Sequence, residues 1–200
     1  MYSIRLLTSV TIVLLTACTA SVQIDKQLGE NDTTTQPVAS LITDSERNDY
    51  RNAITALNND KLDIAEKILK EIIDKRNDLA GPWANLGLVY IRKNDLESAI
   101  QSLNKALQLN PNQPQALNLL GSIEYNKGNL KTAIDLYLSA IKNKPDYANA
   151  HYNLALLYDI YFQDIPKAIE HYKKYLELTD YQDKQTEVWL EQLVSTLKNS

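Results

Sequence analysis

Two consecutive stretches of the chain decide its fold. Residues 80–113 read AGPWANLGLVYIRKNDLESAIQSLNKALQLNPNQ, and residues 114–147 read PQALNLLGSIEYNKGNLKTAIDLYLSAIKNKPDY. Small residues and prolines return 34 residues apart, and the pattern extends beyond these two stretches. A fixed period of this size is typical of a solenoid of stacked helical units. The recurring positions are Ala53, Gly87, Gly121 and Ala155; Ala65, Ala99, Ala133 and, one residue late, Ala168; and Pro111 and Pro145.

This pattern resembles the tetratricopeptide repeat family, whose unit is a pair of antiparallel helices. The resemblance implies an all-α solenoid of about four helix pairs. A degenerate copy is expected over residues 45–79, and further copies over 80–113, 114–147 and 148–182. The residues of the best copy that match the family motif are Trp83, Leu86, Gly87, Tyr90, Ala99, Leu103, Ala106 and Pro111.

The residue types of the repeat also fit helix packing. Gly87 and Gly121 allow two helix backbones to approach closely, while Leu103 and Tyr137, together with Trp83, are expected to fill the space between them. In the last three copies, a short oxygen-bearing side chain falls just before the expected second helix, where it is predicted to cap free amides. These predicted caps are Asp95, Asn129 and Asp164, with Lys61 at the corresponding place of the degenerate copy.

The last copy contains one extra residue, which we place in the turn between Tyr161 and Asp164. Pro166 follows at the first turn of the next helix, where its missing N–H is tolerated. After Asp183 no repeat follows, and residues 183–200 are predicted to form a helix that covers the apolar end of the solenoid. Its expected apolar stripe consists of Val188, Trp189, Leu190, Leu193, Val194 and Leu197.

The N-terminal residues have the layout of a secretory signal peptide over residues 1–17, with Arg5 before an apolar run. That run is too short to span a bilayer permanently. Leu15-Thr16-Ala17-Cys18 resembles the lipobox of bacterial lipoproteins, which implies cleavage before Cys18 and acylation of Cys18, for example with palmitate. An ordinary signal peptide or a structural cysteine is the alternative. Residues 18–44 are polar and are predicted to be a flexible tether.

Lipidation implies a location on a membrane surface. Thr19 follows the cysteine, where an aspartate would resemble an inner-membrane retention signal. In a Gram-negative bacterium we therefore expect a lipid anchor in the outer membrane, on the periplasmic side. In another bacterium the outer face of the plasma membrane is expected.

Composition disfavours several classes of function. The net charge of −4 and the lack of a basic cluster disfavour nucleic acid as a partner. One cysteine and two histidines leave little material for a metal site. His151 stands at a large core position and His171 on a helix face expected to be solvated. No activated nucleophile or phosphate loop is found, so we predict neither enzyme activity nor a cofactor.

Binding of another protein is the remaining source of function. In the family that the chain resembles, the first helices of successive units line a concave groove that takes a peptide or helix segment. Lys and Asn positions of the members that clamp a C-terminal carboxylate are occupied here by Tyr50, Ala84, Asn118 and Tyr152, so such a clamp is disfavoured. The partner-binding candidates that the resemblance implies are Tyr50, Leu88, Asn118, Ser122, Tyr125, Tyr152, Leu156 and Asp159.

A lipidated cysteine combined with this repeat resembles bacterial lipoproteins that assist pilus assembly or secretin placement. It is also similar to adaptors that organise cell-wall hydrolases. Both analogies rest on architecture alone. The sequence therefore predicts a membrane-anchored scaffold, with a cell-wall enzyme or a glycan-binding protein as the rival class.

Overall fold

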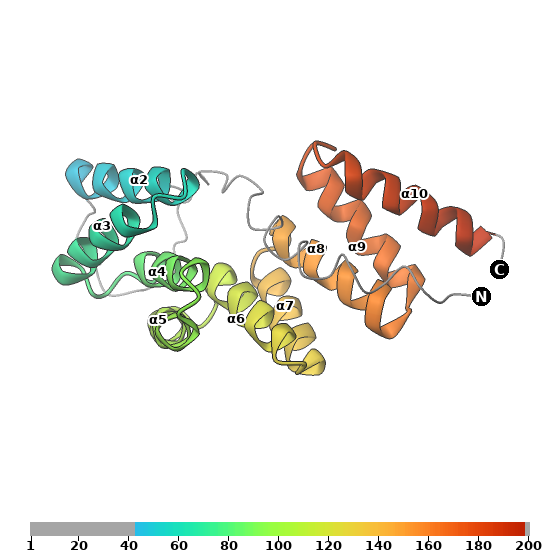
Figure 1. The fold of residues 1–200 in the computed structure, drawn as a ribbon, viewed down its shortest axis with the longest axis horizontal. Helices are drawn as coiled ribbons and strands as arrows, with labels where there is room; N and C mark the ends of the chain where they lie inside the picture. Colours follow the sequence, from blue (N-terminus) through green and yellow to red (C-terminus); the bar gives the residue numbers. More distant parts are fainter. Residues whose placement is uncertain (1–42, 199–200) are drawn as a thin grey trace. The chain divides into compact units, whose positions relative to one another are not determined.

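A computed structural model describes residues 43–198, all of whose regular elements are helices (Figure 1). The predicted signal peptide, Cys18 and most of the predicted tether lie outside these residues. The described chain divides into two compact units, with the boundary between Asn77 and Asp78.

The first unit contains one helix pair, α2 (Asp44–Asn58) and α3 (Leu62–Lys75). A capping box begins α2, because Glu46 N–H donates to Thr43 Oγ1 and Thr43 N–H donates to Glu46 Oε2. Lys61 makes no side-chain cap at the start of α3, as expected for a degenerate copy. Four residues of this helix pair are completely buried: Ala53 and Leu57 on α2, and Ala65 and Leu69 on α3.

The second unit contains three further helix pairs and a final helix (Figure 1). The pairs are α4 (Ala80–Arg92) with α5 (Leu96–Leu109), α6 (Pro114–Asn126) with α7 (Leu130–Asn143), and α8 (Ala148–Leu157) with α9 (Ile165–Leu178). Each pair also packs against the next, through α5 with α6 and α7 with α8. The all-α solenoid predicted from the repeat is thereby confirmed.

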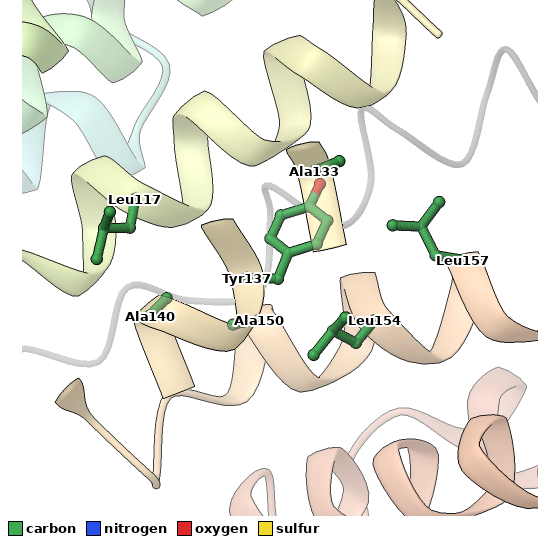
Figure 2. Close-up of a cluster of buried hydrophobic side chains, with 7 residues drawn as sticks. All are labelled: Leu117, Ala133, Tyr137, Ala140, Ala150, Leu154 and Leu157. Atoms are coloured by element: carbon green, nitrogen blue, oxygen red, sulfur yellow. The ribbon is translucent and has the colours of Figure 1, made fainter. Parts of the chain in front are cut away.

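Close packing depends on the predicted small residues. A β-carbon added to Gly87 would lie 2.7 Å from Leu103 Cδ2, which is closer than packed carbon atoms approach. Around Tyr137, one buried cluster joins α6, α7 and α8 (Figure 2). It consists of Leu117, Ala133, Tyr137, Ala140, Ala150, Leu154 and Leu157. Leu103 and Tyr137 thus fill the space left by the glycines, whereas Trp83 stays partly exposed.

The turn within each helix pair contains one residue in the left-handed region, although the residue type differs from pair to pair. These residues are Asp60, Asn94, Gly128 and Gln163, with φ between 51° and 82°. The first three lie 34 residues apart, and Gln163 comes one residue late. The extra residue of the last copy is accommodated earlier than predicted, in a wide π-helical turn, η2 (Tyr158–Phe162), which Gln163 follows as the C-cap.

Two of the three predicted caps are confirmed. Asp95 accepts from Ser98 N–H at 3.1 Å, and Asp164 accepts from Lys167 N–H at 3.3 Å, with Pro166 in the first turn of α9. The prediction for Asn129 is wrong, because its side chain makes no cap. Its Nδ2 instead donates to Glu124 Oε2 at 2.7 Å, where the carboxylate offers a charge-assisted hydrogen bond.

The predicted C-terminal helix is α10 (Lys184–Lys198), which packs against α9. Leu190 and Thr186 are buried there, and Trp189 is partly buried. The predicted apolar stripe is too wide, since Val188 and Leu197 are 49% and 44% exposed. One helix packing against one neighbour covers only part of its circumference.

Candidate protein-binding surface

The first helices α4, α6 and α8 contact one another in succession, and two pairs of side-chain amides join them. Gln115 Nε2 on α6 donates to Asn85 Oδ1 on α4 at 2.7 Å. Asn153 Nδ2 on α8 donates to Asn118 Oδ1 on α6 at 2.9 Å. Asn85 and Asn118 are buried, whereas Gln115 and Asn153 are partly exposed. We call these four residues the amide pairs.

Asn118 and Ser122 lie one turn apart on α6. Ser122 Oγ donates to the Asn118 carbonyl at 3.1 Å and accepts from the Tyr137 hydroxyl at 3.2 Å. Of these two candidates, Ser122 is partly exposed, whereas Asn118 is buried, with 4% of its surface exposed. Leu88, the candidate on α4, is buried as well. The candidates on these two helices therefore differ in how much surface they offer to a partner.

Tyr125, at the end of α6, pairs with Tyr161 in the π-helical turn. The two rings meet edge to face with centroids 5.6 Å apart, and the Tyr125 hydroxyl donates to the Tyr161 hydroxyl at 3.3 Å. Burial and this hydrogen bond raise the pKa of Tyr125, so the phenol stays neutral. Tyr161 is 46% exposed, which gives the pair an accessible aromatic edge.

Tyr152 on α8 faces inward instead of outward. Its ring packs against Tyr172 and Tyr175 on α9, with centroids 6.1 and 4.9 Å apart, and it is 7% exposed. Burial raises its pKa to about 12. Leu156, one turn further along α8, is partly exposed. Of these two candidates, Leu156 offers the more accessible side chain.

Asp159 lies at the start of the π-helical turn and is partly buried. It accepts a long hydrogen bond of 3.5 Å from the Tyr172 hydroxyl. Burial raises the pKa of Asp159, and the hydrogen bond from Tyr172 opposes this effect. Tyr50, the remaining candidate, lies on α2 in the first unit and is partly buried.

The two histidines of the chain lie together. His151 is buried, as expected, and its Nδ1 lies 3.0 Å from His171 Nδ1. The prediction that His171 lies on a solvated face is wrong, because its ring is partly buried and stacks on Tyr158 with an angle of 8° between the ring planes. Tyr158 from η2 and His151 from α8 contact the ring, and the helical pattern of α9 alone does not reveal these contacts.

Sequence reasoning missed Asn85, Asn153 and Tyr161 as parts of this surface. A signal for the two asparagines exists, because in the last three repeat units an amide residue stands two or three positions before the small residue: Asn85 before Gly87, Asn118 before Gly121 and Asn153 before Ala155. Tyr161 had no such signal, because the π-helical turn that carries it is peculiar to the last unit.

The described part of the chain contains no group of three or more His, Cys, Asp or Glu side chains placed to hold a metal ion. Nor does any helix between residues 43 and 198 have the length and apolar character to cross a bilayer.

The sequence model of the tetratricopeptide repeat family matches residues 50–114, 84–148 and 118–183, which together cover more than half of the chain. Among curated proteins, the peroxisomal targeting signal receptor of Saccharomyces cerevisiae is 32% identical over 99 residues. That match covers 48% of this chain but 16% of the receptor, so the chain corresponds to a small part of its relative.

Solved structures share the fold at low sequence identity. The pilF protein of Pseudomonas aeruginosa superposes with a TM-score of 0.66 at 18% identity, over 78% of this chain and 70% of pilF. MamA from Desulfovibrio magneticus RS-1 superposes with a TM-score of 0.52 at 20% identity, over 78% of this chain and 98% of the MamA chain.

Proposed function

Because this chain belongs to the tetratricopeptide repeat family, we propose that it is a membrane-anchored scaffold whose first helices bind a segment of a partner protein. The partner segment lies along α4, α6 and α8, in an extended or helical form. In this proposal the chain assists assembly of an envelope complex such as a pilus or a secretin. It binds no nucleic acid and catalyses no reaction.

The amide pairs are the observation that carries the proposal. Each pair uses one N–H and one carbonyl oxygen, which leaves the oxygens of Gln115 and Asn153 without a hydrogen-bond donor among the described residues. A side-chain amide offers two donors and one acceptor oxygen with two lone pairs. These groups match the N–H and C=O groups of a peptide main chain, so they favour recognition of backbone over recognition of charge.

Apolar contact area next to the amides comes from Leu156 and from the Tyr125–Tyr161 pair. Aromatic side chains supply much of the binding energy in protein interfaces, and loss of one anchor costs about 2 kcal/mol, or roughly 30-fold in affinity. Leu88, Asn118 and Tyr152 are largely buried, so their proposed part is to position the accessible residues. Tyr50 and Asp159 stay candidates for contact.

A matched pair of substitutions tests this surface. Leu156→Arg places a charge on a first helix, whereas Leu138→Arg makes the same change at an exposed position of the second helix α7. After crosslinking in intact cells and mass spectrometry have identified the partner, its affinity is measured for both variants. We expect a loss of at least tenfold for Leu156→Arg and less than twofold for Leu138→Arg. Equal effects on both faces would contradict the proposal.

Cys18 tests the anchor separately from the binding surface. Two or three acyl chains hold a protein stably on a membrane, whereas a single chain is marginal. Cys18→Ser is expected to abolish labelling with a palmitate analogue and to release the chain from the membrane fraction. Partner binding by the purified variant should be unchanged. A Cys18→Ser chain that stays labelled and membrane-bound would disprove the proposed anchor.

Three outcomes, two in cells and one with the purified chain, distinguish the proposed functions. If deletion of this protein leads to loss of secretin multimers, a role in pilus or secretin assembly is supported. Cell-wall hydrolases retained on the tagged chain support the adaptor alternative. Turnover of cell-wall material by the purified chain would contradict a scaffold and support the enzyme class.

A further inference from the structure

The imidazoles of His151 and His171 form a hydrogen bond whose direction is determined by a third group. His151 Nε2 lies 3.0 Å from the carbonyl oxygen of Pro145, which can only accept. His151 Nε2 therefore carries the proton of the neutral ring, and its Nδ1 presents a lone pair. His171 Nδ1, 3.0 Å away, must then be the N–H that donates to it. The contact thus assigns a different tautomer to each histidine.

The geometry is that of a hydrogen bond and not of a metal site. The ring centroids are 5.2 Å apart, close to the nitrogen–nitrogen distance plus the two ring radii, so the nitrogens point directly at each other. Two ring nitrogens that bind one metal ion would instead direct their lone pairs at that ion. The ion would lie to the side of the line that joins the nitrogens, about 2.0–2.1 Å from each of them. The pair also lacks a third ligand within the described chain.

The surroundings of the pair favour neutral rings. Burial lowers the pKa of both histidines, and at His151 the hydrogen bond to the Pro145 carbonyl opposes this effect in part. The charged groups that face them all come from α9: Lys174 lowers the pKa of His151 and Lys167 lowers that of His171, while Glu170 opposes both effects. From η2, Tyr158 stacks on His171, and Lys167 Nζ lies 5.0 Å from the centre of the Tyr158 ring.

We propose that the His151–His171 pair is an acid-sensitive joint between α8 and α9 in the last helix pair. The pair can take up one proton at His171 Nε2 and keep its hydrogen bond. A second proton, on His151 Nδ1, would place two N–H groups opposite each other and break the bond. Tyr152 and Tyr172, the next residues on each helix, pack in the same interface, so the break also loosens their contact.

The direction of the pH effect follows from linkage. Both pKa values lie below the ordinary 6.5 when the protein is folded, so just below pH 6.5 the unfolded chain binds more protons than the folded one. The stability that the pair contributes is complete above pH 6.5. It is lost as the pH falls from 6.5 through the folded-state pKa values. Each unit of pKa difference changes the unfolding constant about tenfold.

Because the chain has two histidines in all, its imidazole NMR signals report this pair alone. A long-range ¹H–¹⁵N spectrum of the full chain at pH 7.5 is expected to show one ring protonated at Nε2 and one at Nδ1. Both rings should titrate below pH 6.5. Two rings protonated at Nε2, or ordinary titration of both, would overturn the proposal without any substitution.

Urea unfolding at pH 7.5 and pH 5.5 tests the effect on stability. We expect the midpoint of the natural chain to fall on acidification, and that of the His151→Gln/His171→Asn double variant, which has no histidine, to fall much less. His171→Asn alone is the matched control, because its Nδ2 can still donate to His151. An equal fall in natural chain and double variant would overturn the proposal. So would stabilisation by one equivalent of Zn²⁺ that requires both histidines.

Discussion

The ring of Tyr137 occupies the space that a side chain at Gly121 would need. A β-carbon added to Gly121 would lie 2.6 Å from Tyr137 Cε1 and 2.8 Å from Cδ1. Since Tyr137 is itself packed within the cluster that joins α6, α7 and α8, the ring has no free space to move into. The absence of a side chain at one position thus allows a large one at another.

Gly121→Ala is therefore expected to destabilise the protein by about 1–3 kcal/mol, as overpacked cores do. The sign is informative, because glycine to alanine in a helix interior normally stabilises by about 0.5–1 kcal/mol. Urea unfolding followed by circular dichroism measures the change. A variant as stable as the natural chain would show that the ring of Tyr137 can shift.

Gly128 provides the contrasting substitution. A β-carbon there would meet no atom within 4 Å, but φ is +82°. Gly128→Ala should cost about 1 kcal/mol through backbone strain alone. The two glycine variants separate the steric from the conformational requirement, because removal of the Tyr137 ring can relieve only the first of them.

Asp159→Asn is expected to stabilise the protein at neutral pH, by up to about 1 kcal/mol. Burial raises the pKa of this carboxyl group, so its ionisation disfavours the folded state. The penalty is complete above the folded-state pKa and vanishes below the unfolded value of about 3.9. Asparagine keeps an acceptor for the Tyr172 hydroxyl. Unfolding midpoints at pH 7 and pH 3 check this, and a stabilisation that is equal at both pH values would contradict it.

Asp183 connects α9 to the start of α10. Its carboxylate accepts from Thr186 N–H at 3.1 Å, from Thr186 Oγ1 at 2.7 Å and from the Tyr175 hydroxyl at 3.1 Å. Asp183→Ala should cost about 1–2 kcal/mol through loss of the helix cap and speed amide exchange in α10. Tyr175→Phe, which keeps the cap, should leave that exchange nearly unchanged. If Tyr175→Phe speeds exchange as much as Asp183→Ala does, the hydrogen bond from the Tyr175 hydroxyl, and not the cap, holds the helix.

Leu190 and Val188 allow a matched comparison on α10. Leu190 is buried against the solenoid end, whereas Val188 is 49% exposed. Leu190→Ser should cost about 2–4 kcal/mol, typical of loss of a buried leucine, and should promote aggregation. Val188→Ser should stay within about 0.5 kcal/mol. Unfolding and size-exclusion chromatography test both, and similar losses would mean that Val188 is covered in solution.

The fold could be predicted because its determinants recur along the chain. Small residues at Gly87 and Gly121 stand opposite Leu103 and Tyr137 at one fixed spacing, so a helix pair and its packing repeat together. Two helix caps could be predicted for a different reason, because Asp95 and Asp164 accept hydrogen bonds from amides within the next turn. Local interactions of this kind need only neighbours in sequence.

Only the tertiary structure decided those features of burial and hydrogen bonding that depend on neighbours from other helices. The burial of His171 comes from its contacts with His151 and Tyr158. The Asn129 side chain donates to the carboxylate of Glu124 on α6 and does not cap α7. The amide pairs join successive first helices, residues 30 and 35 positions apart. A sequence pattern specifies which residues a helix offers. Which side chains are buried or hydrogen-bonded is decided by the geometry with which the next helix packs on it.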